Sequence, residues 1–123
     1  MIQRVATVAV YVEDQEKALE FWRELVGFEV RRRESMGSAG SWLEVAPPGA
    51  GTRLVIYPKS LMASWKELKP SLVLECEDCP ATYHLLKDRG VVFAEGPKKM
   101  PWGTYAKFQD TDGNEFMLKG PVT

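Results

Sequence analysis

Two cysteines are the residues whose spacing suggests chemistry most directly, because they form the motif Cys76-x-x-Cys79. Such a pair can cycle between dithiol and disulfide or supply half of a zinc site. A zinc site needs two more sulfur or imidazole ligands, and the 123-residue chain has two cysteines and one histidine, His84. We therefore interpret both thiols as structural, with a redox pair as the alternative. Cys79 could be mildly reactive, since a helix N-terminus lowers a thiol pKa.

Three consecutive arginines, Arg31 to Arg33, are the densest charge in the chain. Strand alternation places Arg31 and Arg33 on the face opposite Phe28 and Val30, where their guanidinium groups could anchor an anionic ligand. The alternative is a solvated strand face. A slip of one residue in register would invert this assignment.

One carboxylate, Glu75, is a candidate general base. It lies on the same predicted strand as Ser71, an even number of positions along the chain, so both side chains would point to the same face of the sheet. The alternative is a carboxylate at a strand end in contact with solvent. His84 is predicted to lie on the outer, solvated face of a helix.

An internal repeat positions these residues. A strand-like segment, an acidic pair, an amphipathic helix and a glycine occupy residues 5–28 and return sixty-four residues later, in residues 71–91. Thr7 then corresponds to Ser71, and Asp14 to Asp78. A repeat of this kind indicates a duplicated structural unit.

Each half is predicted to be a βαβββ module. Asp14 and Asp78 are expected to cap the helices, and Gly27 and Gly90 to end them. The remaining pattern predicts module 1 at residues 1–58, a connection at 59–70 and module 2 at 71–123, with strands at 1–12, 28–35, 42–46, 53–57, 71–76, 91–94, 104–109 and 115–119.

The composition, with 45% hydrophobic residues and a net charge of −1, is that of an ordinary globular protein. Neither half would bury enough apolar surface alone, so we expect one domain in which the modules pack together. The charge balance disfavours nucleic acid and anionic membranes as partners. We expect a cytoplasmic protein, because the sequence has no run of about 20 apolar residues and no signal-peptide pattern.

Three short motifs carry a resemblance to a known family: Gly27-Phe28 after the first helix, Trp102-Gly103 before a late strand, and the turn Asp110-Thr-Asp-Gly-Asn114. Together with the paired modules, they resemble the vicinal oxygen chelate superfamily, which includes glyoxalases, bleomycin-resistance proteins and extradiol dioxygenases. The resemblance implies an α+β fold in which each module's strands form a U-shaped mixed sheet around a cavity, with helices outside. It also implies a homodimer.

Metal-dependent members of that superfamily use His or Gln on the first strand of each module and Glu on the last. The corresponding positions here are Thr7, Ser71, Met117 and either Val55 or Ile56. None is a ligand that a divalent ion prefers. We therefore expect no metal and no cofactor, as in bleomycin-resistance-like members, which bind a ligand without an ion.

The predicted function is metal-independent binding or sequestration of a small aromatic or anionic molecule. The alternatives are a lyase, isomerase or dioxygenase of the same superfamily acting on a small oxygenated substrate, and a regulatory domain with a vestigial cavity. Glu75 is the candidate catalytic residue. The predicted ligand-binding residues are Thr7, Tyr11, Arg31, Arg33, Trp42, Glu44, Tyr57, Ser71, Trp102, Tyr105, Lys107 and Met117.

Overall fold

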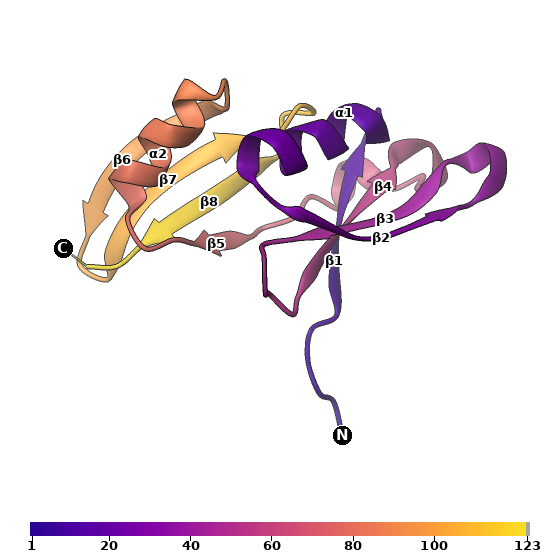
Figure 1. Ribbon diagram of the computed structural model, residues 1–123, viewed down its shortest axis with the longest axis horizontal. Helices are drawn as coiled ribbons and strands as arrows, with labels where there is room; N and C mark the ends of the chain where they lie inside the picture. The colour runs from indigo at the N-terminus through magenta and orange to yellow at the C-terminus, as the bar shows by residue number, and fades with distance from the viewer. Residues whose placement is uncertain (123) are drawn as a thin grey trace. The chain divides into compact units, whose positions relative to one another are not determined.

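The computed structural model describes residues 1–122. The chain forms two compact units, the first comprising Met1–Pro70 and the second beginning at Ser71. Each unit contains a four-stranded mixed sheet with a helix over one of its faces (Figure 1). The boundary lies at the end of the predicted connection, and the predicted α+β class is confirmed.

The first unit has the predicted βαβββ order. Its sheet order is β1-β4-β3-β2, with β1 parallel to β4 and the other pairs antiparallel. Its elements are β1 (Thr7–Val12), α1 (Gln15–Glu20) continued by a π-helical segment (Phe21–Val26), β2 (Glu29–Ser35), β3 (Ser41–Ala46) and β4 (Arg53–Pro58), with 3₁₀ turns at Gly37–Ala39, Lys59–Leu61 and Trp65–Glu67.

The first helix begins and ends where the sequence predicts. Asp14 accepts hydrogen bonds from the backbone N–H groups of Glu16 and Lys17, and so satisfies donors that a helix start leaves unpaired. Gly27 ends the helical segment with φ = 90°, a conformation that favours glycine. The buried side of the helix is formed by Ala18, Leu19, Phe21 and Trp22.

The second unit repeats this plan with the sheet order β5-β8-β7-β6. Its elements are β5 (Val73–Glu75), α2 (Cys79–Asp88), β6 (Val92–Met100), β7 (Gly103–Gln109) and β8 (Glu115–Gly120). Asp78 caps α2 by accepting from the N–H of Ala81. The predicted end of one strand was wrong, because β6 continues six residues beyond Ala94. In α2, Leu86 is buried, while its neighbour Leu85 is 51% exposed.

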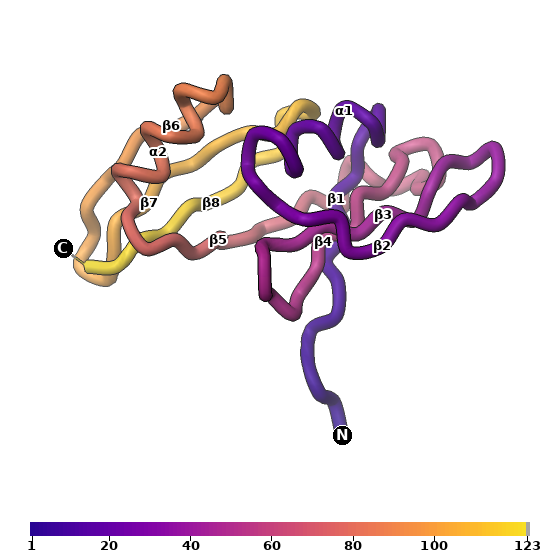
Figure 2. Tube along the Cα trace, viewed as in Figure 1, coloured from indigo at the N-terminus to yellow at the C-terminus, as the bar shows by residue number. Residues whose placement is uncertain are grey.

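The strand register supports the internal duplication. Ala9 pairs with Val55 across β1 and β4, and Val73 pairs with Met117 across β5 and β8. The two parallel pairs therefore occupy equivalent places in their sheets. Figure 2 traces the chain through both pairs. This register decides which residue of β4 occupies the position of a metal ligand in the superfamily: Val55, and not Ile56, is the counterpart of Met117.

The turn between β7 and β8 forms as predicted. Asp110 is buried, and its Oδ1 accepts from the N–H groups of Asp112 and Asn114. Burial raises the pKa of the Asp110 carboxyl, although its hydrogen bonds to Asn114 and Asp112 act in the opposite direction. Gly113 supplies the left-handed residue of the turn at φ = 79°.

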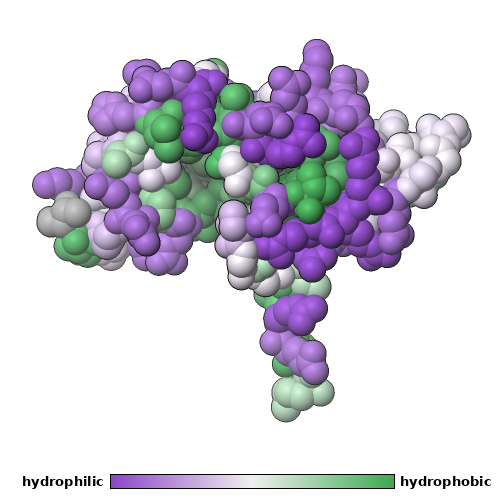
Figure 3. Space-filling model, viewed as in Figure 1, coloured by the Kyte–Doolittle hydropathy of each residue, from purple (hydrophilic) through white to green (hydrophobic). Residues whose placement is uncertain are grey.

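The residues before β1 are exposed. Ile2 and Val5 are 91% and 63% exposed, and the segment extends away from the first sheet as a narrow projection (Figure 3). Across residues 1–122, none of the helices has both the length and the apolar character needed to cross a bilayer.

Candidate functional site

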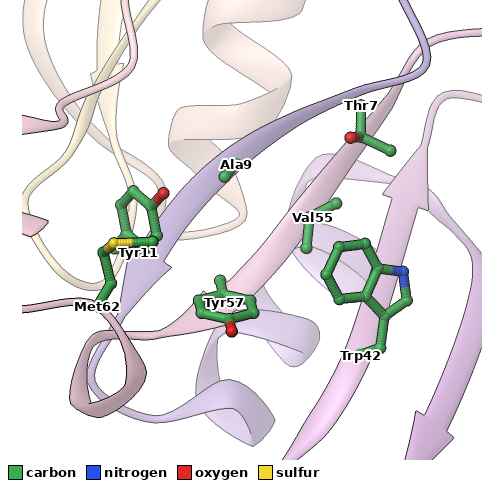
Figure 4. Close-up of a pocket in the computed structure, with 7 residues that line it drawn as sticks. All are labelled: Thr7, Ala9, Tyr11, Trp42, Val55, Tyr57 and Met62. Carbon is green, nitrogen blue, oxygen red and sulfur yellow. The ribbon is translucent and has the colours of Figure 1, made fainter.

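A pocket of about 240 Å³ lies on the face of the first sheet that points away from α1. We call this face the pocket face. Strand alternation selects its residues, because the intervening positions Val10, Leu43 and Ile56 are buried on the opposite face. The lining residues come from β1, β3, β4 and the segment after β4 (Figure 4): Thr7, Ala9, Tyr11, Trp42, Val55, Tyr57 and Met62.

Three aromatic rings form a row along the pocket. Tyr57 lies between Tyr11, whose ring centroid is 6.0 Å away at an interplanar angle of 88°, and Trp42, at 6.1 Å and 76°. These are edge-to-face arrangements, which aromatic rings favour. Met62, from the segment after β4, also lines the pocket (Figure 4). The pocket is therefore lined by flat, polarizable groups.

A buried carboxylate holds Trp42 in place. Glu44 is only 5% exposed, and it accepts hydrogen bonds from Trp42 Nε1 at 2.7 Å and Arg53 Nη1 at 2.9 Å. Burial by itself raises the pKa of Glu44, but these two hydrogen bonds and the nearby arginine charges outweigh burial and lower that pKa. Glu44 is therefore ionised at neutral pH.

Charges alternate across three strands of the pocket face. Next to the Arg53–Glu44 pair, Arg32 lies opposite Glu44 in the β2–β3 register and forms an ion pair with Glu34, with Nε to Oε1 at 2.9 Å. This contact raises the pKa of Arg32 and lowers the pKa of Glu34. We call these four residues the charge row. It contains two positive and two negative groups.

The predicted placement of Arg31 and Arg33 was wrong. A bulge between Val30 and Arg32 shifts the alternation of β2 by one residue and leaves Arg31 as the extra residue. Arg31 donates to the carbonyl oxygens of Pro47 and Ala50. Arg33 pairs with Glu16 of α1, on the helix side of the sheet. Arg32 occupies the pocket face instead.

Gln15 fixes the strand that carries Trp42. Its Oε1 accepts from the N–H of Ser41 at 3.0 Å, and its Nε2 donates to the carbonyls of Ser41 at 2.7 Å and Ile56 at 2.8 Å. One side chain at the start of α1 therefore satisfies backbone groups of both β3 and β4. Gly40 leaves room for it, because a Cβ there would lie 2.6 Å from Gln15 Oε1.

The predicted site residues of the second unit lie on or next to its sheet. Met117 pairs with both Val73 and Lys107, and Lys119 pairs with both Glu75 and Tyr105. Ser71 precedes β5 and is exposed, and Trp102, in the turn before β7, is 60% exposed. Glu75 is exposed and borders an open hollow formed with Cys76, Glu77 and Pro121.

The cysteine environment contradicts the expectation of a reactive Cys79. The Cys79 side chain is 1% exposed, and burial, together with Cys76 and Asp78, raises the pKa of its thiol. Cys76 is half-buried, and its Sγ lies 3.4 Å from the carbonyl oxygen of Lys119. His84 is exposed, as predicted, and its ring packs edge-on against Tyr83.

The residues at the superfamily's metal positions do not fit a divalent ion. Thr7 and Val55 face the pocket of the first unit, and Ser71 and Met117 are their counterparts in the second. No histidine, carboxylate or thiolate stands at any of them. Within residues 1–122, no three or more His, Cys, Asp or Glu side chains gather closely enough to hold an ion.

Sequence reasoning missed four residues around the pocket and left a fifth, Val55, undecided against Ile56. Ala9 and Val55 could have been found by extending the alternation from Thr7 and Tyr57. Arg53 and Arg32 required the strand register, and Met62 required the path of the chain after β4. The missed residues are Ala9, Arg32, Arg53 and Met62.

Comparison with known proteins identifies relatives over nearly the whole chain. The family model described as "Glyoxalase/Bleomycin resistance protein/Dioxygenase superfamily" matches residues 4–118. The Bacillus subtilis (strain 168) protein YetH is 55% identical over 119 residues, which cover 97% of this chain and 99% of YetH.

Two solved structures have the same fold. TnmS3, described as an antibiotic binding protein from Streptomyces sp. CB03234, is 40% identical with a TM-score of 0.84 and 98% of each chain covered. A superfamily member from Sphaerobacter thermophilus is 33% identical with a TM-score of 0.86, covering 97% of this chain and 98% of that one. The chain therefore belongs to the glyoxalase/bleomycin resistance protein/dioxygenase superfamily.

Proposed function

We propose that this protein binds and sequesters a small aromatic molecule in the pocket of its first unit, without a metal ion. The observation that carries the proposal is the aromatic row Tyr11–Tyr57–Trp42 lining that pocket. Aromatic side chains offer large contact areas at a small cost in conformational entropy.

The way Trp42 is held supports binding by a preorganised surface. Its indole N–H is already hydrogen-bonded to a buried carboxylate, so the ring is fixed before a ligand arrives. Preorganisation lowers the entropy lost on binding. A pocket of about 240 Å³ is slightly smaller than the range of about 300–1,000 Å³ usual for drug-sized ligands. A ligand with one or two fused rings suits it.

The relatives support sequestration over catalysis. TnmS3 is described as an antibiotic binding protein, and at 40% identity it offers a precedent for ligand binding on the same fold. The superfamily's lyase, isomerase and dioxygenase chemistry relies on an ion, and the residues at the metal positions do not fit one.

The test is calorimetric titration of the chelator-treated protein with naphthalene derivatives, repeated with Trp42→Leu. We expect one saturable site in the native protein and an affinity up to about ten-fold weaker in the variant, because an aromatic pair is worth about 0.5–1.5 kcal/mol beyond its buried area. Trp65→Leu is the matched control, because Trp65 lies outside the pocket. Binding that appears only after manganese, iron(II), nickel or zinc is added would favour an enzyme instead.

A further inference from the structure

The pocket has a polar end at Thr7 and Arg53, and this end bears on whether the ligand is neutral or anionic. Thr7 lines the pocket and pairs with Arg53 across β1 and β4. Arg53 lies two residues from Val55 on the same face, and its side chain is 37% exposed. A guanidinium group has five N–H donors, and Arg53 uses Nη1 to hold Glu44, so other donors of Arg53 remain for a ligand that reaches the Thr7 end of the pocket.

The charge of this end is already balanced. Arg53 pairs with Glu44, and Arg32 pairs with Glu34, so the charge row sums to zero. Glu44 is the member that is most deeply buried. An anionic ligand that approached Arg53 would also approach the Glu44 carboxylate, and like charges at short range oppose each other in a partly desolvated site. A neutral acceptor would take the same hydrogen bond without that repulsion.

We infer that this pocket selects uncharged aromatic ligands that carry a hydrogen-bond acceptor such as a carbonyl oxygen, and that Glu44 is the residue that rejects anionic ones. The inference rests on the proposed function and narrows its ligand class, which the sequence left open between aromatic and anionic molecules. Glu44 acts as a positioning residue: it holds Trp42 and Arg53 and places a negative charge behind the donor.

The inference is tested with two probes of nearly the same shape, 2-acetonaphthone and 2-naphthoate, with naphthalene as the reference. Titration of the native protein should give an affinity at least about ten-fold higher for the ketone than for the carboxylate. Glu44→Gln keeps the side-chain shape and removes the negative charge. It should therefore raise the naphthoate affinity relative to that of the ketone by about ten-fold.

A second variant separates this role from a structural one. Arg32→Gln removes a positive charge from an exposed member of the charge row whose ion-pair partner is Glu34 rather than Glu44. This variant should change the ratio of the naphthoate affinity to the ketone affinity in the opposite direction from Glu44→Gln, because it should weaken naphthoate binding further relative to the ketone. Loss of structure would weaken both probes together and could not produce opposite shifts. Because Arg32 is exposed, this variant tests the inference even if Glu44→Gln fails to fold.

The outcomes distinguish the two proposals. The selectivity inference would be overturned, with aromatic binding left intact, if naphthoate bound as tightly as the ketone or more tightly. It would also be overturned if the ratio of the two affinities were the same in both variants as in the native protein. Failure of naphthalene and both derivatives to bind would overturn the proposed function and this inference together.

Discussion

Replacing Arg53 with Met should turn Glu44 from a stabilising group into a destabilising one. The side chains of Arg53 and Glu44 are 37% and 7% exposed, and Nη1 and Oε1 are 2.9 Å apart. Breaking a fully buried pair costs about 3–5 kcal/mol, because the remaining charge has no partner. Since Arg53 is partly solvated, and Trp42 still donates to Glu44, we expect a loss of about 2 kcal/mol at neutral pH.

The pH dependence identifies the cause. In the native protein the pKa of Glu44 is lowered, so its stabilisation is present above the ordinary glutamate pKa and is lost as pH falls through the folded-state value. Without Arg53, burial dominates and the folded-state pKa rises above the ordinary one. The ionised form then destabilises Arg53→Met at neutral pH, and acidification relieves the penalty. The difference between native and variant should shrink between about pH 7 and about pH 4.

The assay is urea unfolding followed by circular dichroism at both pH values. Arg32→Met is the matched control, because its ion pair with Glu34 has side chains that are 50% and 59% exposed. An exposed pair contributes about 0–1 kcal/mol. The double variant Arg53→Met, Glu44→Gln should regain part of the lost stability at neutral pH. An equal loss at both pH values, or no recovery in the double variant, would refute this reasoning.

Three further predictions follow from the contacts described above. Gln15→Ala should lower the free energy of unfolding by about 2–3 kcal/mol in urea titrations, since it leaves backbone groups of β3 and β4 without their partner. The control is Gln109→Ala, which changes a partly exposed glutamine of β7 and should cost about 0.5 kcal/mol, the size of an ordinary surface substitution. Asp110→Ala should lower the free energy of unfolding by about 2–3 kcal/mol in the same assay, because the N–H groups of Asp112 and Asn114 lose their acceptor. An unchanged urea midpoint would show that these hydrogen bonds do not stabilise the turn. In folded protein, iodoacetamide should alkylate Cys76 faster than Cys79, which is buried and has a raised pKa; peptide mass spectrometry reads the order, and faster labelling of Cys79 would show that its burial is wrong.

The fold was largely predictable because its signals are local. Asp14 and Asp78 cap the helices, Gly27 ends the first of them, and the turn at Asp110 forms as its residues indicate. Each signal depends on neighbours within about four residues. The repeat then extended the assignment from one unit to the other.

The site was less predictable because it depends on register. A single bulge in β2 moved Arg31 and Arg33 off the pocket face and placed Arg32 on it. The Glu44–Arg53 pair joins two strands through a diagonal contact that no local pattern marks. Tyr11, Trp42 and Tyr57 were predictable, because large side chains alternate with buried aliphatic ones along their strands.

The most direct test of the central claim is a two-dimensional NMR titration of the protein with 2-acetonaphthone in the presence of a metal chelator. We predict saturable shifts in the backbone and methyl signals of Thr7, Ala9, Val55 and Met62, which line the pocket. Signals of Glu75 and Cys76, in the second unit's hollow, should stay unchanged. Shifts centred on that hollow, or shifts that require an added divalent ion, would contradict the account.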